Sequence, residues 1–249
     1  MKYIILEEVD STNSYVSLHA PELEDMTMVA AHSQTAGRGQ RGNSWESEPG
    51  RNLTFTLLAR ELPVAPADQF AISEGVALAV ADYLRGEGIE AEVKWPNDIY
   101  VADRKISGIL IEHSLTGTKI EQTRIGVGLN VNQTEFRSDA PNPVSMSQLT
   151  GKNYDISRVA AGVGVCLERR LSMLGDPQGR KMLHDEFKGR LWRRDGVHPF
   201  RRRDNGEEFA GSIEDVLPQG PIRIRDTQRG EVTDYMFKEV EFLLKPLKS

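Results

Sequence analysis

A glycine-rich loop that carries arginines most constrains how this chain can fold. Residues 37–42 read GRGQRG, and Trp45 follows three positions later. Glycine lets the backbone turn through positive φ and leaves amide N–H groups bare, while arginine can fork onto carboxylate or phosphate oxygens. The segment therefore predicts a loop that closes over an anionic ligand. A solvated hairpin loop would explain the glycines, but not two arginines and a tryptophan beside them.

The same letters fit the dinucleotide pattern GxGxxG, which needs a strand before it and a helix that opens within it. A strand is expected at residues 28–31, but residues 43–50 (NSWESEPG) are typical of turns. A second strand is expected at residues 53–58. The loop is therefore expected to join two strands, and a Rossmann nucleotide site is disfavoured.

Composition excludes several classes of protein. The 249 residues carry a net charge of -6, which disfavours a nucleic-acid partner. A single cysteine, Cys166, excludes an internal disulfide framework and fits a reducing compartment. No signal peptide and no apolar run of membrane-spanning length is recognisable, so no membrane partner and a cytoplasmic location are expected.

The residue pattern predicts an α+β fold, with a central mixed β-sheet and flanking helices, followed by a small all-β barrel. Strands are expected at residues 3–6, 28–31, 53–58, 91–95, 99–101, 106–111 and 124–131. Helices are expected at residues 12–18, 67–84 and 155–174, and within residues 179–192. The pattern changes to short strands and turns near Asp195. Two domains are therefore expected, at residues 1–195 and 196–249.

Two further polar motifs could bind a ligand or be structural. Residues 11–13 (STN) could cap a helix or offer hydroxyl and amide groups to a ligand, and the residues alone leave both open. Residues 94–98 (KWPND) place a cation, an aromatic ring, an amide and a carboxylate side by side after a strand. Within that motif, core packing is the favoured role of Trp95.

Five motifs in chain order resemble those of the biotin protein ligases, and the resemblance covers nearly the whole chain. They are STN at residues 11–13, GRGQRG at 37–42 with Gln34 before it and Trp45 after it, KWPND at 94–98, KISGIL at 105–110 and GVGLN at 126–130. The resemblance implies a class II synthetase-like catalytic domain and an SH3-like C-terminal barrel. It also implies ATP-dependent attachment of biotin to a lysine of a biotin carboxyl carrier protein domain, through biotinyl-5′-AMP.

The resemblance assigns roles to individual residues. Lys105 and Arg38 are implied as catalytic, and biotin and ATP as substrates with Mg²⁺, for which Asp98 is the candidate ligand. The residues implied in biotin binding are Ser11, Thr12, Asn13, Gln34, Arg38, Gly39, Gln40 and Lys105. The residues implied in ATP or adenylate binding are Arg41, Lys94, Asn97, Asp98 and Asn130. Gln40 stands where the family often has arginine, which removes one charge from the loop.

Other functions remain open at this point. A lipoate-protein ligase or acyltransferase on the same scaffold is the nearest alternative, and a non-catalytic biotin-binding module is another. The catalytic pattern begins at the first residues, so the monofunctional type without a winged-helix DNA-binding domain is expected. No DNA partner is therefore expected, whereas a homodimer is possible.

Overall fold

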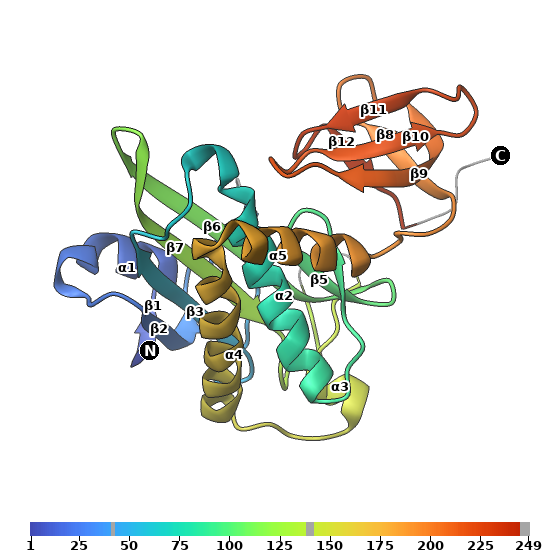
Figure 1. Cartoon of the computed structure of the whole chain (residues 1–249). Coiled ribbons are helices and arrows are strands. Elements are labelled where there is room, and N and C mark those ends of the chain that lie inside the picture. The colour runs from blue at the N-terminus through green and yellow to red at the C-terminus, as the bar shows by residue number, and fades with distance from the viewer. Residues whose placement is uncertain (41–42, 138–141, 245–249) are drawn as a thin grey trace.

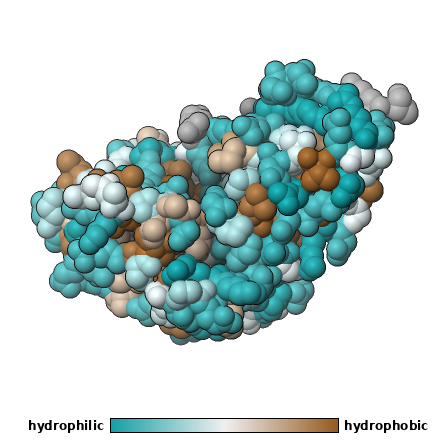
Figure 2. All heavy atoms as spheres, turned by 45° about the horizontal axis from the view of Figure 1, so that its top comes forward, coloured by the Kyte–Doolittle hydropathy of each residue, from teal (hydrophilic) through white to brown (hydrophobic). Residues whose placement is uncertain are grey.

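The computed structural model describes residues 1–40, 43–137 and 142–244. A large sheet forms the body of the molecule, helices cover it, and a separate small sheet follows at the C-terminal end (Figure 1). None of the helices in the described part of the chain is long and apolar enough to cross a membrane. On the face drawn in Figure 2, hydrophilic residues cover most of the surface and hydrophobic ones form small patches.

The large sheet has seven strands in the order β1-β2-β3-β7-β6-β5-β4. Their bounds are β1 Lys2–Val9, β2 Thr27–Gln34, β3 Leu53–Arg60, β4 Glu92–Lys94, β5 Asp98–Val101, β6 Arg104–Thr116 and β7 Lys119–Leu129. The pair β1–β2 is parallel and every other pair is antiparallel. The expected mixed sheet is confirmed, and the glycine loop joins β2 to β3 as expected.

Helices lie on both faces of this sheet. The helix α1 (Thr12–His19) packs through Val16 on one face, while α2 (Phe70–Gly86), α4 (Ile156–Leu171) and α5 (Pro177–Gly189) pack together over the other. Alternation along β2 explains how one strand serves both layers, because Met28 belongs to the larger core and Val29 to the smaller one.

One short helix, α3 (Met146–Thr150), was not expected from the sequence. Ser145 begins it with a capping box, because its side chain accepts from the N–H of Gln148 and the Gln148 side chain accepts from the N–H of Ser145. Five residues are too few to produce a helical hydrophobic period. Short 3₁₀ turns also occur at Ala20–Glu22, Pro66–Asp68 and Ser172–Gly175.

The C-terminal strands form a second, five-stranded antiparallel sheet in the order β11-β10-β9-β8-β12, consistent with the expected SH3-like unit. The strands are β8 His198–Arg202, β9 Glu208–Val216, β10 Ile222–Asp226, β11 Val232–Tyr235 and β12 Val240–Phe242. Phe242 packs against Trp192, with ring centroids 5.8 Å apart. The indole Nε1 of Trp95 donates a 2.8 Å hydrogen bond to the carbonyl of Gly220. These contacts fix the small sheet beside residues 94–98.

Candidate active site

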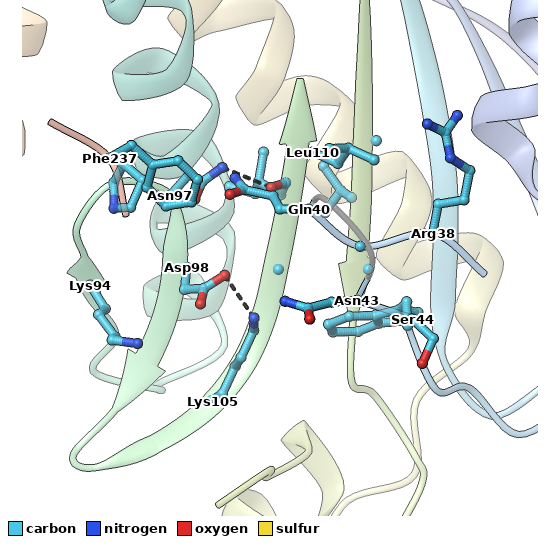
Figure 3. A pocket seen from close by; sticks show the side chains of 18 of the residues that line it. Arg38, Gln40, Asn43, Ser44, Lys94, Asn97, Asp98, Lys105, Leu110 and Phe237 are labelled. Carbon is cyan, nitrogen blue, oxygen red and sulfur yellow. Dashed lines mark hydrogen bonds and ion pairs between the residues drawn. The ribbon is translucent and has the colours of Figure 1, made fainter. Parts of the chain in front are cut away.

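A cavity of about 950 Å³ lies over β6 and β7 and is bounded by the C-terminal sheet. Its lining includes residues 11–13, part of the glycine loop, residues 94–98, Lys105 and the turn at Phe237. Figure 3 shows Asp98 and Lys105 between the loop on one side and Lys94 on the other. Motifs far apart in the sequence therefore share one cavity.

The start of α1 forms one end of the cavity. Ser11 caps the helix, since its Oγ accepts from the N–H of Asn13 at 3.2 Å. Gln34 fixes Thr12, the residue after Ser11, because Oε1 of Gln34 accepts from the N–H of Thr12 at 2.8 Å. The hydroxyl of Thr12 lies 3.0 Å from that of Thr56. Ser11, Thr12 and Gln34 thus form a hydrogen-bonded frame, and the capping reading of Ser11 is correct.

Asn13 differs from its neighbours, because its side chain is buried and unpaired. It is 3 % exposed, and neither its Oδ1 nor its Nδ2 has a hydrogen-bond partner within residues 1–40, 43–137 and 142–244. An unpaired buried polar group costs roughly 1–3 kcal/mol. The amide presents one acceptor and two donor hydrogens to the cavity. This arrangement fits a ligand that carries both N–H and C=O groups.

Glycines on β6 and β7 make room at the cavity floor. A Cβ on Gly126 would lie 3.5 Å from Nδ2 of Asn13. A Cβ on Gly128 would lie 2.2 Å from the Trp45 ring, and one on Gly108 would lie 2.9 Å from it. Both distances are too short for any real contact. The Trp45 ring therefore packs directly against Gly108 and Gly128. This contact explains why the KISGIL and GVGLN motifs have glycine at these two positions.

The centre of the cavity holds an ion pair between neighbouring strands. Nζ of Lys105 on β6 lies 2.8 Å from Oδ1 of Asp98 on β5, and both side chains are about one quarter exposed. The dashed line in Figure 3 marks this pair. The two charges compensate each other, so neither is an isolated group.

Lys94 is a partly buried cation of the cavity. Its Nζ donates to the hydroxyl of Tyr100 at 3.3 Å and lies 4.9 Å from the centre of that ring. Burial lowers the pKa of the Lys94 amine, partly offset by the nearby carboxylate of Asp98. Asn97 is 7 % exposed, and its Nδ2 donates to the carbonyl of Ile109, which fixes the turn after β4.

The glycine loop lines the opposite side. Nη2 of Arg38 donates to Oε1 of Glu112 on β6 at 3.1 Å. The N–H of Gly39 donates to the carbonyl of Asn43, which tightens the loop, and Gln40 lines the cavity. Arg41 lies outside the described residues.

Asn130 is not among the residues that line the cavity. It is 3 % exposed, its Nδ2 donates to the carbonyl of Val144, and its own carbonyl accepts from the N–H of Met146. These bonds join the end of β7 to the start of α3. In this structure Asn130 has a scaffold position, whereas the other described residues to which the sequence assigned ligand contacts line the cavity.

Some lining residues could not be selected from the sequence. Phe237, in the turn after β11, lines the cavity 6.2 Å from the Trp95 ring, centroid to centroid. Arg201 and Arg203 also line it, and both form ion pairs with Glu241. All three belong to the C-terminal part of the chain, so only the tertiary fold brings them here.

A preformed metal centre is not evident in the described part of the chain, since no three His, Cys, Asp or Glu side chains gather there. Mg²⁺ commonly uses one or two carboxylates together with substrate phosphates. Asp98 fits that limited requirement. Cys166 on α4 is partly buried away from this cavity, and burial raises the pKa of its thiol.

The mixed sheet, the C-terminal sheet and the polar cavity between them define a ligand-binding protein of the α+β class. Comparison with known proteins gives the family. Residues 5–130 match the model of the biotin/lipoate A/B protein ligase family, and the chain belongs to this family. The structure is similar to that of the Aquifex aeolicus biotin protein ligase in complex with biotin and ATP. The TM-score is 0.81 with 23 % identity, over 96 % of this chain and 97 % of the other. At that identity the likeness concerns the fold.

Curated relatives match over part of their length. The bifunctional ligase/repressor BirA of Escherichia coli is 36 % identical over 162 residues, which are 63 % of this chain and 49 % of that protein. The BirA protein of Bacillus subtilis is 33 % identical over 150 residues, 58 % of this chain and 45 % of its own. The biotin–[acetyl-CoA-carboxylase] ligase of Paracoccus denitrificans is 34 % identical over 158 residues, 61 % and 65 % of the two chains. The chain thus spans about half the length of the BirA proteins that it matches.

Proposed function

We propose that this protein attaches biotin to a lysine of a biotin carboxyl carrier protein domain, using ATP and forming biotinyl-5′-AMP. The observation that carries this proposal is the buried, unpaired amide of Asn13 at one end of a cavity whose centre holds Lys105. The Paracoccus denitrificans relative, which is named biotin–[acetyl-CoA-carboxylase] ligase, supports it. We further propose residues 1–195 as the catalytic domain and 196–249 as the SH3-like domain.

The ureido ring of biotin suits the Asn13 end of the cavity. One of its N–H groups can donate to Oδ1 of Asn13, and its carbonyl can accept from Nδ2. Ser11, Thr12 and Gln34 hold α1 in place for this contact. The dithiolane ring of lipoate has no N–H or C=O group and would leave the Asn13 amide unpaired, a penalty that discriminates strongly between substrates. This end of the cavity therefore favours biotin over lipoate.

The proposed chemistry has two steps. The biotin carboxylate attacks the α-phosphorus of ATP, a P–O bond forms, and pyrophosphate leaves. The neutral amine of a carrier lysine then attacks the biotinyl carbonyl, an amide bond forms, AMP leaves, and the amine loses a proton. Neither step needs a protein nucleophile, so the chain's contribution is positioning and charge stabilisation.

The cations of the cavity suit that contribution. Lys105 lies at its centre and would stabilise the negative charge that develops on the α-phosphate. Arg38 would meet the biotin carboxylate or the α-phosphate, and Lys94 with Asn97 would hold the nucleotide. Mg²⁺, held by Asp98 and the phosphates of ATP, would neutralise phosphate charge. We place the reaction in the cytoplasm, where ATP is supplied and the thiol of Cys166 stays reduced.

The first half-reaction tests this assignment without a carrier domain. The protein is incubated with ATP, Mg²⁺ and biotin, and released pyrophosphate is measured against a matched reaction with lipoate. We expect about one equivalent of pyrophosphate per active site with biotin and a background level with lipoate. A larger burst with lipoate would make the protein a lipoate ligase, and no burst with either acid would exclude acid activation.

A further inference from the structure

Glu112, on β6, contacts two arginines from different parts of the chain. Its Oε1 accepts a 3.1 Å hydrogen bond from Nη2 of Arg38, in the glycine loop. Its Oε2 lies 3.8 Å from Nε of Arg124, on β7. Neither the sequence motifs nor the chemistry proposed above uses Glu112 or Arg124. One carboxylate is thus shared between a cavity arginine and an arginine of the sheet.

The two arginines are held very differently. The side chain of Arg38 is 46 % exposed and that of Arg124 only 13 %. Arg124 lies directly opposite Glu112 in the β6–β7 register, and its Nη1 donates to Oγ of Ser114 at 3.3 Å. Figure 3 shows the guanidinium of Arg38 extending away from Lys105. Arg124 therefore belongs to the scaffold, whereas Arg38 is the partner that a ligand could draw away.

The Nε of Arg124 gives Glu112 an alternative partner. This buried Nε–H has no hydrogen-bond partner among the residues that the structure describes. Its 3.8 Å separation from Oε2 of Glu112 is longer than a hydrogen bond, so a small shift of the carboxylate would complete one. Release of Arg38 would then leave Glu112 paired, and a buried donor would be satisfied. The exchange costs less than breaking an isolated ion pair.

We propose that Glu112 is a positioning residue that holds the Arg38 guanidinium at the cavity rim and competes for it with the anionic ligand. Arg124 takes over the carboxylate when Arg38 turns to the ligand. The identity of that ligand, an adenylate, rests on the proposed function. Because partly exposed ion pairs are weak, the competition changes ligand affinity by roughly two- to fivefold.

The test is a double-mutant cycle on affinity for biotinol-5′-AMP, a hydrolysis-resistant adenylate, measured by calorimetry. The variants are Glu112→Gln, Arg38→Ala and the double variant. The control is Glu121→Gln on the same hairpin, where the Glu121 carboxylate accepts from the hydroxyl of Thr116. We expect Glu112→Gln to tighten binding about two- to fivefold and to have no effect when Arg38 is alanine. Glu121→Gln should bind as the unmodified protein does.

A second variant, Arg124→Gln, should change adenylate affinity in the opposite direction. Arg124→Gln removes the alternative partner, so Glu112 should retain Arg38 more firmly and binding should weaken by a similar factor. Thermal unfolding of each variant shows whether the fold is kept. The proposal is overturned if Glu112→Gln weakens binding, leaves it unchanged, or has the same effect with and without Arg38.

A separate measurement keeps this inference distinct from the proposed function. If the unmodified protein binds no adenylate, the proposed function fails, and the Arg38 Nε–H signal is then followed by ¹⁵N NMR during titration with inorganic pyrophosphate. The signal is assigned by its loss in Arg38→Ala. A shift at lower pyrophosphate concentration in Glu112→Gln than in the unmodified protein supports the competition. Equal concentrations, or no shift in either protein, contradict it.

Discussion

Lys105 and Asp98 form one charged unit, with Nζ and Oδ1 2.8 Å apart across adjacent strands. The sequence suggests separate roles for them, a central cation and a metal ligand. Their pairing means that a substrate phosphate or a metal ion must share or displace the contact. Because both side chains are about one quarter exposed, the pair itself adds only about 0–1 kcal/mol to stability.

Replacing Lys105 should therefore damage catalysis more than folding. We expect Lys105→Ala to slow biotin-dependent pyrophosphate release by on the order of 10²–10³, the usual cost of one charge-stabilising donor. Thermal unfolding should change little. The matched control is Lys119→Ala, at the far end of the same hairpin. A folded Lys105→Ala variant with near-normal release would remove Lys105 from the mechanism.

Asn13 should control which acid binds. Asn13→Ala removes both hydrogen-bonding groups that we assign to the ureido ring, so we expect biotin affinity to fall by about 1–3 kcal/mol, or roughly five- to 150-fold. Lipoate binding should not weaken, because its ring offers the amide no partner and the variant removes a group that lipoate would leave unpaired. Calorimetry with both acids tests this, and an equal loss for both would show that Asn13 acts only through the fold.

Arg38 should contribute more than Gln40 to retention of the reactive adenylate. Arg38 can offer a charged, forked contact, whereas Gln40 offers only a neutral amide. We expect Arg38→Ala to raise the biotin Kd and to release adenylate, seen as biotin on bystander lysines, and Gln40→Ala to do so less. Equal or greater leakage from Gln40→Ala would show that backbone amides or position 40 itself retain the adenylate.

The buried amine of Lys94 should make the KM for ATP depend on pH. Burial lowers the pKa of its amine, so this lysine loses its charge at a lower pH than an exposed lysine does. The charged form binds phosphate, so the KM for ATP should rise as pH increases through that lowered pKa. A pH series of KM should show the rise in the unmodified protein and a flatter profile in Lys94→Ala. Identical profiles would exclude contact between Lys94 and ATP.

The sequence predicted the strands, the longer helices and the second sheet because each has a clear hydrophobic period or a strong cap. It also grouped most cavity residues, through motifs that resemble a family. Local pattern could not reveal α3, which is one turn and a half held by a capping box. It also could not show that Asn130 bonds to Val144, because that contact depends on how two loops meet.

The pairing of charged side chains also could not be predicted from the sequence. Arg38 and Glu112 are 74 residues apart in sequence, and their contact depends on the β6 register and the path of the loop. Similarly, Arg201 and Arg203 form a basic run in sequence, but both pair with Glu241 in the structure. Whether the charges of such a run are paired depends on the tertiary fold and cannot be read from the sequence.

The central claim is transfer of biotin to a carrier lysine, and intact mass of the carrier measures it most directly. A biotin carboxyl carrier protein domain is incubated with this protein, biotin, ATP and Mg²⁺, with parallel reactions lacking ATP and containing a carrier whose acceptor lysine is arginine. We expect the mass of one biotin on the unmodified carrier, only with ATP, and none on the arginine variant. An unchanged mass in the complete reaction, or the same gain without ATP, would contradict the account.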